Sequence, residues 1–509
     1  MNTTGQFLAI DQSTSSTKAM LFDLDGHLLD QEWLLHRQIY PRAGWVEHDA
    51  EEIFGNTLKV LASLLARHAE HLKSLLALSI TNQRETFVLF DRATGRPLYN
   101  AIVWQCRRGD EFCSTLRTAG EEQVVHELTG LRLDTYFPAS KLRWLLDARP
   151  DLRTRLKDGS ALFGTIDTYL IYRLTGGKVY ATDHTNASRT LFYDIGRLGW
   201  SRDLCKLFGL AFDELPEVRE SAAGYGHTNL NGLLAKMIPV SGVMGDSQAA
   251  LFAQRCFKPG SAKVTFGTGS SVLLNIGHEK RLSGGGIVTA LAWVLQGVPT
   301  YAFEGIINFT GATISWLRDQ LQLIADVAET ETLARTVADT DGVYFIPAFV
   351  GLSAPYWRAD ARAAILGMSP STTRAHIVRA ALESIGFVVT DVLKAMGEDA
   401  GVKLSMLQAD GGAVRNAFLM QFVADLTRME VRAAKTPELS ALGAVFSGGL
   451  GLKIYASLED LQGLSLGFDE HIPEMDPALA QKLFAGWQSA VQQVLYQPTQ
   501  GQRHETKNH

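Results

Sequence analysis

The chain has 509 residues, of which 46% are hydrophobic and 20% charged, and its formal net charge is −6. These values are typical of a soluble globular protein with two or three domains, each large enough for a full apolar core. The acidic balance argues against a nucleic-acid-binding surface, which normally carries a basic patch.

The sequence indicates neither export nor a membrane span. The polar residues 1–6 lack a basic n-region, and no apolar run reaches the length of a transmembrane helix. The four cysteines have no metal-ligand spacing and are too few for a disulfide framework. We therefore expect reduced, mostly buried thiols and a cytoplasmic protein.

Two segments of the chain look like copies of one hairpin. Residues 7–22 and 263–275 each read as an apolar strand, a turn of small polar residues, and a second apolar strand. Backbone N–H groups can face outward in such turns and form a concavity that suits phosphate oxygens. The two copies predict a duplicated α/β chain that grips a polyphosphate between its halves, and therefore a nucleotide-using enzyme such as a kinase.

In the first hairpin, Asp11 ends a strand beside the turn at residues 13–16. A carboxylate beside phosphates is suited to a site in which Mg²⁺ lies between them, directly or through waters. The alternative is an Asx-turn, in which the side chain caps its own backbone. The local sequence alone favours the Asx-turn.

The first half then alternates strands and helices, with a helix expected at residues 50–71 and strands at 77–80 and 86–90. Arg84 and Glu85 fall in the turn between these two strands. A guanidinium donor and a carboxylate acceptor at adjacent positions can hold neighbouring hydroxyls of a polyol. The alternative is an exposed pair at a solvated hairpin tip, where it would contribute little.

Aromatic and basic residues follow this turn. Trp104, Tyr136 and Phe137 could provide flat apolar walls for a substrate, or could belong to the core. The pair at residues 107–108 reads as the solvated start of a helix.

Asp246 follows an apolar strand at the point where a helix begins. There it could accept the proton of a substrate hydroxyl that attacks a γ-phosphoryl group. It could equally be a helix N-cap, a role that Asp fills well, and the local sequence favours the cap.

The second half restarts near residue 257, so we place domains at residues 1–255 and 256–498, with a disordered tail at 499–509. In the second hairpin, Gly267 and Gly269 allow the backbone to come close to a phosphate group, and Thr268 supplies a hydroxyl.

Residues 404–416 read as a strand, a double-glycine turn and the start of a helix. A nucleotide could lie against the bare backbone of this turn, or the glycines could serve turn geometry alone. Further helices are expected at residues 374–395 and 416–428.

Seven longer stretches resemble the FGGY family of carbohydrate kinases, and most of all its members that phosphorylate glycerol. They occur in order and at similar spacing: 39–49, 80–86, 99–108, 163–170, 182–189, 346–357 and 410–416. The resemblance implies a duplicated actin/hexokinase-like (ribonuclease-H-like) two-domain ATPase fold with an interdomain cleft. It also implies ATP and Mg²⁺ as cofactors, a small polyol as substrate, and a homo-oligomer, either a dimer or a tetramer.

The resemblance also assigns roles to residues. Asp246 matches the family's general base, and Asp11 and Asp246 match its magnesium-associated carboxylates. The residues that match polyol-binding positions are Arg84, Glu85, Trp104, Tyr136, Asp246, Ser247 and Ser271. The residues that match nucleotide-binding positions are Ser13, Thr14, Ser15, Lys18, Thr268, Gly311, Ser315, Gly412 and Asn416.

Four positions depart from the family pattern. Lys18 replaces the usual Arg, which keeps a charge near the phosphates but gives up the bidentate fork, and Ser13 replaces a glycine. Ser247 and Ser271 replace a glutamine and a phenylalanine beside the substrate. The pocket should therefore be wider and more polar, which suits a polyol or ketose with one or two more carbons, although waters could fill the gap around glycerol.

A further departure concerns regulation. Regulated bacterial members of the family carry a glycine-rich loop ending in Thr-Arg that binds fructose 1,6-bisphosphate. The corresponding stretch here, residues 231–236, has no such arginine. We hypothesise that fructose bisphosphate does not inhibit this protein, and strong inhibition at micromolar concentration would contradict this.

The favoured hypothesis is ATP-dependent phosphorylation of glycerol to sn-glycerol 3-phosphate. The first alternative is a kinase for a four- or five-carbon polyol or ketose, such as erythritol or erythrulose. An alternative of another class is a nucleotide-dependent switch of the actin or chaperone kind. Such a switch would not need Arg84 and Glu85 to face Asp246 across a cleft.

Overall fold

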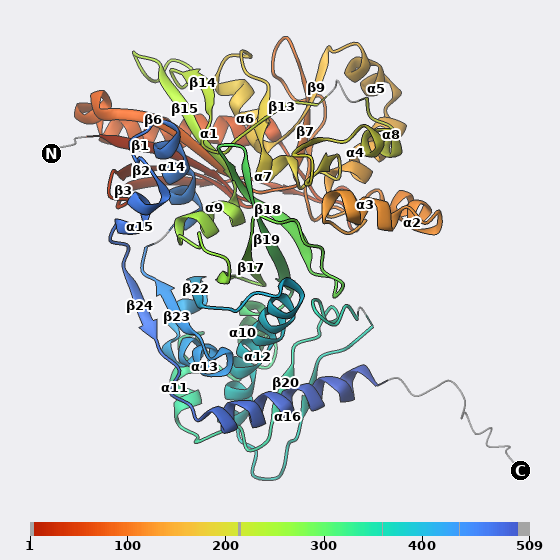
Figure 1. Cartoon of the computed structure of the whole chain (residues 1–509), viewed down its shortest axis with the longest axis vertical. Coiled ribbons are helices and arrows are strands. Elements are labelled where there is room, and N and C mark those ends of the chain that lie inside the picture. The colour runs from red at the N-terminus through yellow and green to blue at the C-terminus, as the bar shows by residue number, and fades with distance from the viewer. Residues whose placement is uncertain (1–4, 212–214, 359, 437, 497–509) are drawn as a thin grey trace, which may run out of the picture.

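The computed structural model describes residues 5–211, 215–358, 360–436 and 438–496. Figure 1 shows an upper body built from the first half of the chain and a lower body built from most of the second half. The tail at 499–509, expected to be disordered, lies outside the described residues. Within the described ranges, no helix is both long and apolar enough to cross a membrane.

A six-stranded sheet forms the centre of the upper body. Its inner strands are apolar and buried on both faces, as in sheets that are covered by helices on both sides. Helix α1 (Ala50–Arg67) packs against its β2–β3 side, and α14 (Leu439–Gly451) packs against β15, β6 and β1. The strand order is β14 (Gly224–Thr228), β15 (Ile238–Gly245), β6 (Leu75–Asn82), β1 (Gln6–Gln12), β2 (Ser16–Asp23) and β3 (Leu28–Leu35).

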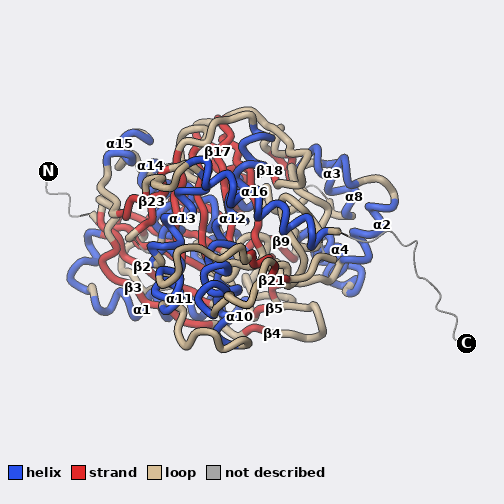
Figure 2. Tube along the Cα trace, turned by 90° about the horizontal axis from the view of Figure 1, so that it is seen from below, coloured by secondary structure: helices blue, strands red, loops and turns tan. Residues whose placement is uncertain are grey.

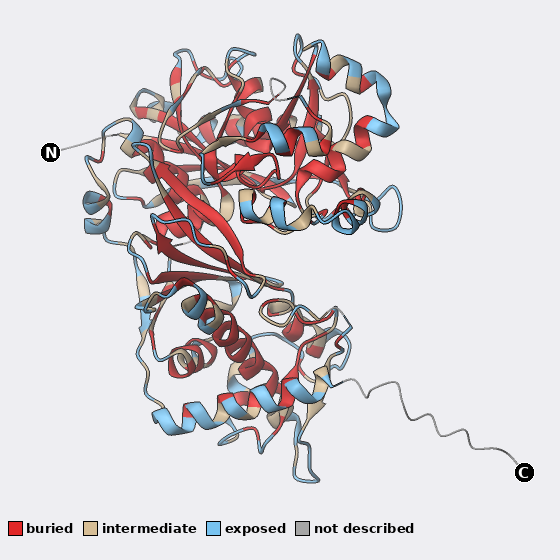
Figure 3. Cartoon of the chain, turned by 45° about the vertical axis from the view of Figure 1, so that its right-hand side comes forward, coloured by how far each residue is buried: buried red, intermediate tan, exposed pale blue. Residues whose placement is uncertain are grey.

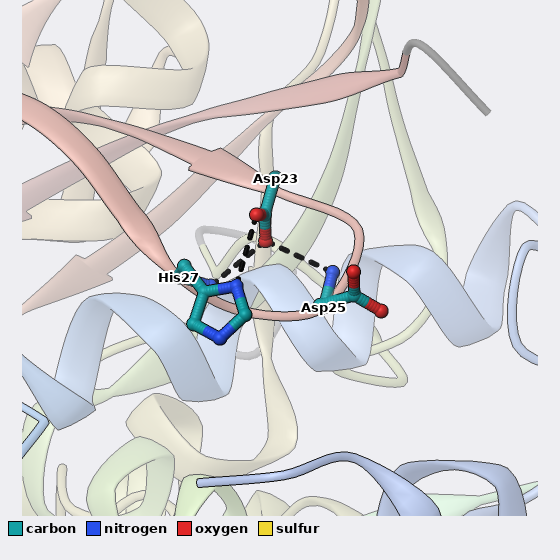
Figure 4. A group of neighbouring side chains, drawn as sticks. All are labelled: Asp23, Asp25 and His27. Carbon is teal, nitrogen blue, oxygen red and sulfur yellow. Dashed lines mark hydrogen bonds and ion pairs between the residues drawn. The ribbon is translucent and has the colours of Figure 1, made fainter. Parts of the chain in front are cut away.

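The turn between β2 and β3 is held by Asp23 (Figure 4). Its Oδ1 accepts hydrogen bonds from the backbone N–H groups of Asp25 at 2.9 Å and His27 at 2.8 Å. The ring Nδ1 of His27 lies 3.0 Å from Asp23 Oδ2. The clustering of Asp23, Asp25 and His27 is therefore explained by the hydrogen bonds that stabilise this turn.

Helix α1 is shorter than the sequence pattern predicted. Asp49 caps its start by accepting from the N–H groups of Glu51 and Glu52, and the helix ends at Arg67 instead of His71. A 3₁₀ helix at Ala69–Ser74 follows and leads directly into β6. The apolar period continues through this tighter turn, so the sequence alone could not separate the two.

A seven-stranded sheet forms the centre of the lower body. Strand β16 pairs antiparallel with β17 and parallel with β22, which is the relation that β1 has to β2 and β6. Both predicted hairpins are therefore confirmed, and they occupy equivalent places in two sheets. The strand order is β18 (Val288–Leu295), β19 (Val298–Ile307), β17 (Ser270–Gly277), β16 (Ser261–Phe266), β22 (Met406–Gly411), β23 (Glu430–Ala434) and β24 (Phe468–His471).

Helices cover the seven-stranded sheet on its lower side. The two predicted helices are α12 (Arg374–Ala400) and α13 (Ala417–Thr427), which pack against β17, β19 and β23. Seen from below, α12, α13 and α16 (Pro477–Leu495) lie in front of the strands (Figure 2). Figure 3 shows that the strands are largely buried, whereas the outer helices carry exposed residues.

A smaller five-stranded sheet rules out the alternative of a hairpin at residues 77–90. Strands β6 and β7 (Phe87–Asp91) do not pair as a hairpin, because β6 belongs to the six-stranded sheet and β7 to this one. The segment at residues 82–86 therefore crosses between two sheets and is buried. The strand order is β4 (Gln38–Ile39), β5 (Glu47–His48), β8 (Ala101–Ile102), β7 and β9 (Ala161–Thr165).

The remaining elements surround these sheets. Short paired strands are β10 (Ala181–Asp183) with β13 (Glu217–Arg219), β11 (Tyr193–Asp194) with β12 (Gly199–Trp200), and β20 (Tyr344–Ile346) with β21 (Ala364–Leu366). The helices are α2 (Asp110–Thr118), α3 (Glu122–Thr129), α4 (Pro138–Ala148), α5 (Pro150–Lys157), α6 (Ile166–Leu174), α7 (His184–Ala187), α8 (Arg202–Phe208), α10 (Gly311–Asp319), α11 (Glu329–Arg335) and α15 (Leu458–Gly463).

The chain crosses between the two bodies three times. Helix α9 (Asp246–Ala253) packs against strands of both large sheets before the chain enters β16. After β23 the chain returns, because α14 packs on the six-stranded sheet, and it crosses again to reach β24 of the seven-stranded sheet. These crossings place residues of one half beside residues of the other.

Candidate active site

A cleft of about 1890 Å³ lies between the two large sheets, and the turns of both hairpins line it. The predicted residues that line it are Asp11, Thr14, Arg84, Glu85, Trp104, Tyr136, Asp246, Ser247, Thr268, Ser271 and Gly412. The predicted residues outside this lining are Ser13, Ser15, Lys18, Gly311, Ser315 and Asn416.

Arg84 and Glu85 form a buried corner of this cleft, so the solvated hairpin tip is wrong. Their side chains are 6% and 2% exposed, because the segment between β6 and β7 runs through the interior. The Nε of Arg84 lies 3.1 Å from Oδ1 of Asp246. Burial raises the pKa of Glu85, an effect that Arg189 and Arg84 oppose.

Two more buried charged side chains, Glu304 and Arg189, extend this corner. Glu304, on β19, accepts from Arg84 Nη2 at 2.7 Å and from Arg189 Nη1 at 2.5 Å. Arg189 in turn donates through Nε to Glu85 Oε1 at 2.5 Å. Burial alone would raise the pKa of Glu304, but Arg189 and Arg84 outweigh it and hold the pKa at about 2. Glu304 is therefore ionised at neutral pH.

Aromatic side chains form one wall of the cleft. The ring centroids of Trp104 and Tyr136 lie 5.2 Å apart, and those of Tyr136 and Phe137 lie 5.3 Å apart. Trp104 Nε1 donates to Thr14 Oγ1 at 3.0 Å, which ties this wall to the first hairpin turn. The buried ammonium of Lys141 donates to the backbone oxygens of Trp104 at 3.2 Å and Tyr136 at 3.1 Å.

The prediction that residues 107–108 form the solvated start of a helix agrees with the structure for the first residue only. Arg107 is exposed and pairs with Asp110 in the first turn of α2. Arg108 is buried, however, with Nη2 2.6 Å from Oε1 of Glu47 and its guanidinium 4.0 Å from the ring centroid of Trp45. It is a core residue and not a solvated helix start.

Asp246 is the first residue of α9, directly after β15. The N-cap is Gly245, so the expectation that Asp246 could be the cap is wrong. Its side chain is 38% exposed and faces the cleft. Arg84 holds the Asp246 carboxylate just beyond the end of the buried strand β15, where a substrate hydroxyl in the cleft can reach it.

Asp11 has a carboxylate oxygen, Oδ1, that is buried and has no hydrogen-bond partner. Burial raises its pKa to about 7; Lys18 opposes this shift, while Glu438 and Asp246 add to it. In the adjacent turn, Ser13 Oγ accepts from Ser16 N–H at 3.2 Å. The ammonium of Lys18 lies 2.7 Å from both carboxylate oxygens of Glu438.

Two glycines of the second half are required by close packing. Gly411 has φ 94°, and a Cβ there would lie 2.2 Å from the backbone oxygen of Phe266. A Cβ on Gly311 would lie 2.5 Å from the backbone oxygen of Gly267. In contrast, a Cβ on Gly412 would meet nothing within 4 Å, so this residue presents open backbone to the cleft.

Asn416 and Ser315 lie on helices next to the second hairpin. The Oδ1 of Asn416 accepts from Leu419 N–H at 2.9 Å and caps α13, and its Nδ2 donates to Thr330 Oγ1 at 3.2 Å. Ser315 is half-buried on α10, whose first residue, Gly311, donates from N–H to the oxygen of Gly267.

Reasoning from single residues of the sequence missed several polar groups of the site. Lys263, on β16, lines the cleft and donates to Thr265 Oγ1 at 2.7 Å. Gln248, on α9, accepts from Arg84 Nη1 at 3.2 Å. Glu304 is a single charged residue inside an apolar strand, and that signal could have identified it.

Comparison with known proteins identifies the family of this chain. The sequence profile of the FGGY family of carbohydrate kinases, N-terminal domain, matches residues 6–253, and that of the C-terminal domain matches residues 262–452. The chain belongs to the FGGY family of carbohydrate kinases. As a member of this family it is an ATP-using kinase with an alcohol acceptor, built on the two-domain actin-like fold.

Individual members of the FGGY family are similar over nearly the whole chain. A glycerol kinase of Shewanella sp. (strain MR-4) is 47% identical over 485 residues, which cover 95% of this chain and 98% of that protein. The crystal structure of Plasmodium falciparum glycerol kinase with ADP has a TM-score of 0.93 and 36% identity, and covers 97% of this chain and 99% of that one. A xylulose kinase from Rhodospirillum rubrum has a TM-score of 0.84 at 23% identity, covers 96% of this chain and 99% of that one, and shares the fold.

Proposed function

We propose that this chain transfers the γ-phosphoryl group of ATP to glycerol and releases sn-glycerol 3-phosphate and ADP. The observation that carries the proposal is the contact of 3.1 Å between Arg84 and Asp246, beside the buried Glu85 and at the wall of the cleft. The similarity to glycerol kinases over 95% of the chain supports it. A nucleotide switch without an acceptor substrate would not require this polar corner.

Arg84 has free donors for a polyol. A guanidinium carries five N–H groups: Nη1 and Nη2 of Arg84 donate one each, to Gln248 and Glu304, and Nε lies 3.1 Å from the carboxylate of Asp246. The remaining two can bind hydroxyl oxygens of the substrate, while Glu85 accepts from its hydroxyl groups. The Trp104–Tyr136 wall lies beside the carbon chain.

Asp246 would act as the general base. It takes the proton of the terminal hydroxyl as that oxygen forms a bond to the γ-phosphorus and the bond to the β-phosphate oxygen breaks. Arg84 holds the carboxylate in place, and the apolar wall and the opposite domain exclude water that would otherwise hydrolyse ATP.

Asp11 and Asp246 are the residues that would hold Mg²⁺. The unpartnered, buried Oδ1 of Asp11 fits this role, because a hard cation prefers carboxylate oxygens and an unsatisfied buried oxygen needs a partner. When bound, Mg²⁺ supplies positive charge that offsets the phosphate oxygens.

The two hairpin turns would hold the phosphates. Thr14 and Thr268 line the cleft, and Gly412 offers open backbone to the nucleotide. Six further residues are proposed to belong to the nucleotide site, where they would shape these turns and helix ends: Ser13, Ser15, Lys18, Gly311, Ser315 and Asn416.

We further propose a domain boundary at residue 255, a cytoplasmic location and a homo-oligomer.

One observation favours a second candidate substrate. The Oγ of Ser271 is buried without a hydrogen-bond partner, and the residue lines the cleft together with Ser247. An additional hydroxyl of a four- or five-carbon polyol or ketose could satisfy it, because buried hydroxyls normally have partners.

A substrate panel tests both candidates. ADP release would be measured with glycerol, erythritol, erythrulose and xylulose, and the values of kcat/KM compared. We expect glycerol to give the highest value. In the variant Ser271→Phe, the phenyl ring fills space beside the substrate and should lower kcat/KM for the longer substrates more than for glycerol.

A higher kcat/KM for erythritol or erythrulose than for glycerol would establish the second candidate instead. If none of these compounds stimulates ADP release, the kinase assignment of this site is wrong and the nucleotide switch gains support.

A further inference from the structure

Glu304 connects the polyol corner to the opposite domain. It lies in the middle of β19, where it faces Leu273 of β17 on one side and Val288 of β18 on the other. Its side chain is 0% exposed. Arg84 and Arg189, by contrast, belong to the N-terminal domain, within the matched residues 6–253. The two guanidinium groups therefore reach across the domain interface to one carboxylate.

Each oxygen of this carboxylate has its own partner. Oε1 accepts from Arg84 and Oε2 accepts from Arg189. Arg189 also holds Glu85, so a single carboxylate fixes both members of the proposed polyol-binding pair, one directly and one through Arg189. Charge-assisted hydrogen bonds of this kind impose direction as well as attraction.

The surroundings leave few other ways to hold these groups. Arg84, Glu85, Arg189 and Glu304 are all at most 6% exposed, so water cannot replace a lost partner. Glu85 also has a φ of 62°, a left-handed conformation that is costly for a residue other than glycine. A backbone in that conformation depends on its neighbours to stay in place.

We infer that Glu304 is a positioning residue for the polyol: it holds Arg84 and, through Arg189, Glu85 in the geometry that binds the substrate. This inference rests on the proposed function. It also assigns a role to the interface, because the polyol site of the N-terminal domain is complete only when β19 of the C-terminal domain is docked against it.

The variant Glu304→Gln tests this inference. Its amide keeps the shape of the side chain, but its oxygen can accept from only one guanidinium and its NH₂ group would face the other. Calorimetric titration should show a rise of about ten-fold or more in the Kd of glycerol, as expected for a broken buried charge pair. The Kd of ADP should stay unchanged, and KM should rise for glycerol but not for ATP.

Glu304→Asp provides a conservative variant and a second test should the glutamine variant fail to fold. It keeps the charge but withdraws the carboxylate by one methylene. We expect a Kd for glycerol above that of the wild type and below that of Glu304→Gln, with the Kd of ADP again unchanged.

Glu383→Gln is the matched control for loss of a buried carboxylate. Glu383 is 4% exposed on α12, pairs with Arg379 at 2.7 Å and lies outside the cleft lining. We expect this variant to change Tm without changing the Kd of glycerol.

Three results would contradict the inference. Glu304→Gln could bind glycerol as tightly as the wild type, or it could lose affinity for glycerol and ADP by the same factor, as a purely structural residue would. Wild-type protein that binds none of the polyols would overturn the proposed function itself, and with it this inference. The titration of the wild type in the same series separates that failure from the first two.

Discussion

The carboxylate of Asp246 is accessible from the cleft and is also held in place by Arg84. Of the three carboxylates beside Arg84, that of Asp246 is substantially exposed, at 38% for its side chain, while Glu85 and Glu304 are almost completely enclosed. A base must reach the solvent side of the cleft to meet a substrate, whereas residues that orient it can be buried. This division of roles among neighbouring carboxylates follows from their positions on α9, the β6–β7 segment and β19.

The variant Asp246→Asn should therefore lose turnover and keep nucleotide binding. An amide cannot take the proton of the attacking hydroxyl, and loss of a general base lowers rates by roughly two to four orders of magnitude. The measurement is kcat with saturating glycerol and ATP, together with the Kd of ADP by calorimetry. Asp151→Asn, at an exposed residue of α5, should leave both unchanged. A near-normal kcat for Asp246→Asn would remove this residue from the base role.

The sequence supported the roles of single residues unevenly. Asp246 and Asp11 each had a more common local explanation, and only the resemblance over the whole chain favoured a role in catalysis. The structure rejects the capping role of Asp246, because Gly245 is the cap. Burial of Arg84 and its bond to Glu304, 220 residues away in the sequence, could not be read from local pattern.

At the scale of elements, apolar runs on either side of a small polar turn predicted both hairpins, and apolar residues at helical spacing predicted the long helices α12 and α13. The alternative of a solvated hairpin tip between β6 and β7 is wrong, because the two strands belong to different sheets. Local sequence specifies that a segment is extended, but the sheet that it joins depends on contacts with residues far along the chain. The buried segment between these strands is where Arg84 and Glu85 form the polyol corner, so the choice between the two alternatives concerned a functional segment.

A helix end near the second hairpin gives a prediction at this scale. Asn416→Ala removes the cap of α13 and its bond to Thr330, which should lower the free energy of unfolding by about 1 kcal/mol. Urea denaturation monitored by circular dichroism measures this change. Asn416→Asp keeps a capping oxygen and should retain most of the stability. Equal losses in the two variants would show that the cap is not what Asn416 contributes.

The whole molecule places its site where the two domains meet. Helix α9 contacts both large sheets and begins with Asp246, and α14 returns from the lower body to the six-stranded sheet. The resemblance predicted this two-domain arrangement with its cleft. The contacts by which Glu304 joins the domains, to Arg84 and Arg189, became visible only in three dimensions.

Buried carboxyl groups also affect the stability of the molecule as a whole. Burial raises the pKa of Glu383 to about 7 and those of Asp167 and Asp391 to about 6. Such groups hold a proton in the folded state at a pH where the unfolded chain has released it. The folded state then binds more protons than the unfolded state, so their contribution to the free energy of unfolding falls as pH rises through that range.

Asp391 provides the clearest test, because its Oδ2 accepts from Trp487 Nε1 at 2.6 Å and from the Tyr356 hydroxyl at 2.8 Å inside the core around α12. Burial raises its pKa from an ordinary value of 3.8 to about 6, although these hydrogen bonds and Lys394 oppose the shift. The variant Asp391→Asn has no proton to lose. Relative to the wild type, it should gain about 2 kcal/mol between pH 4 and pH 7, with most of the gain below pH 6.

The measurement for Asp391→Asn is urea denaturation of both proteins, without nucleotide, across that pH range. Near pH 4 the protonated carboxyl and the amide are similar in shape and charge, so the two proteins should have similar stability. As pH rises, the wild type must either keep the proton or bury a charge beside Trp487, and the variant does neither. A stability difference that is the same at every pH would show that Asp391 is already ionised in the folded core, with its two hydrogen bonds sufficient to hold the charge.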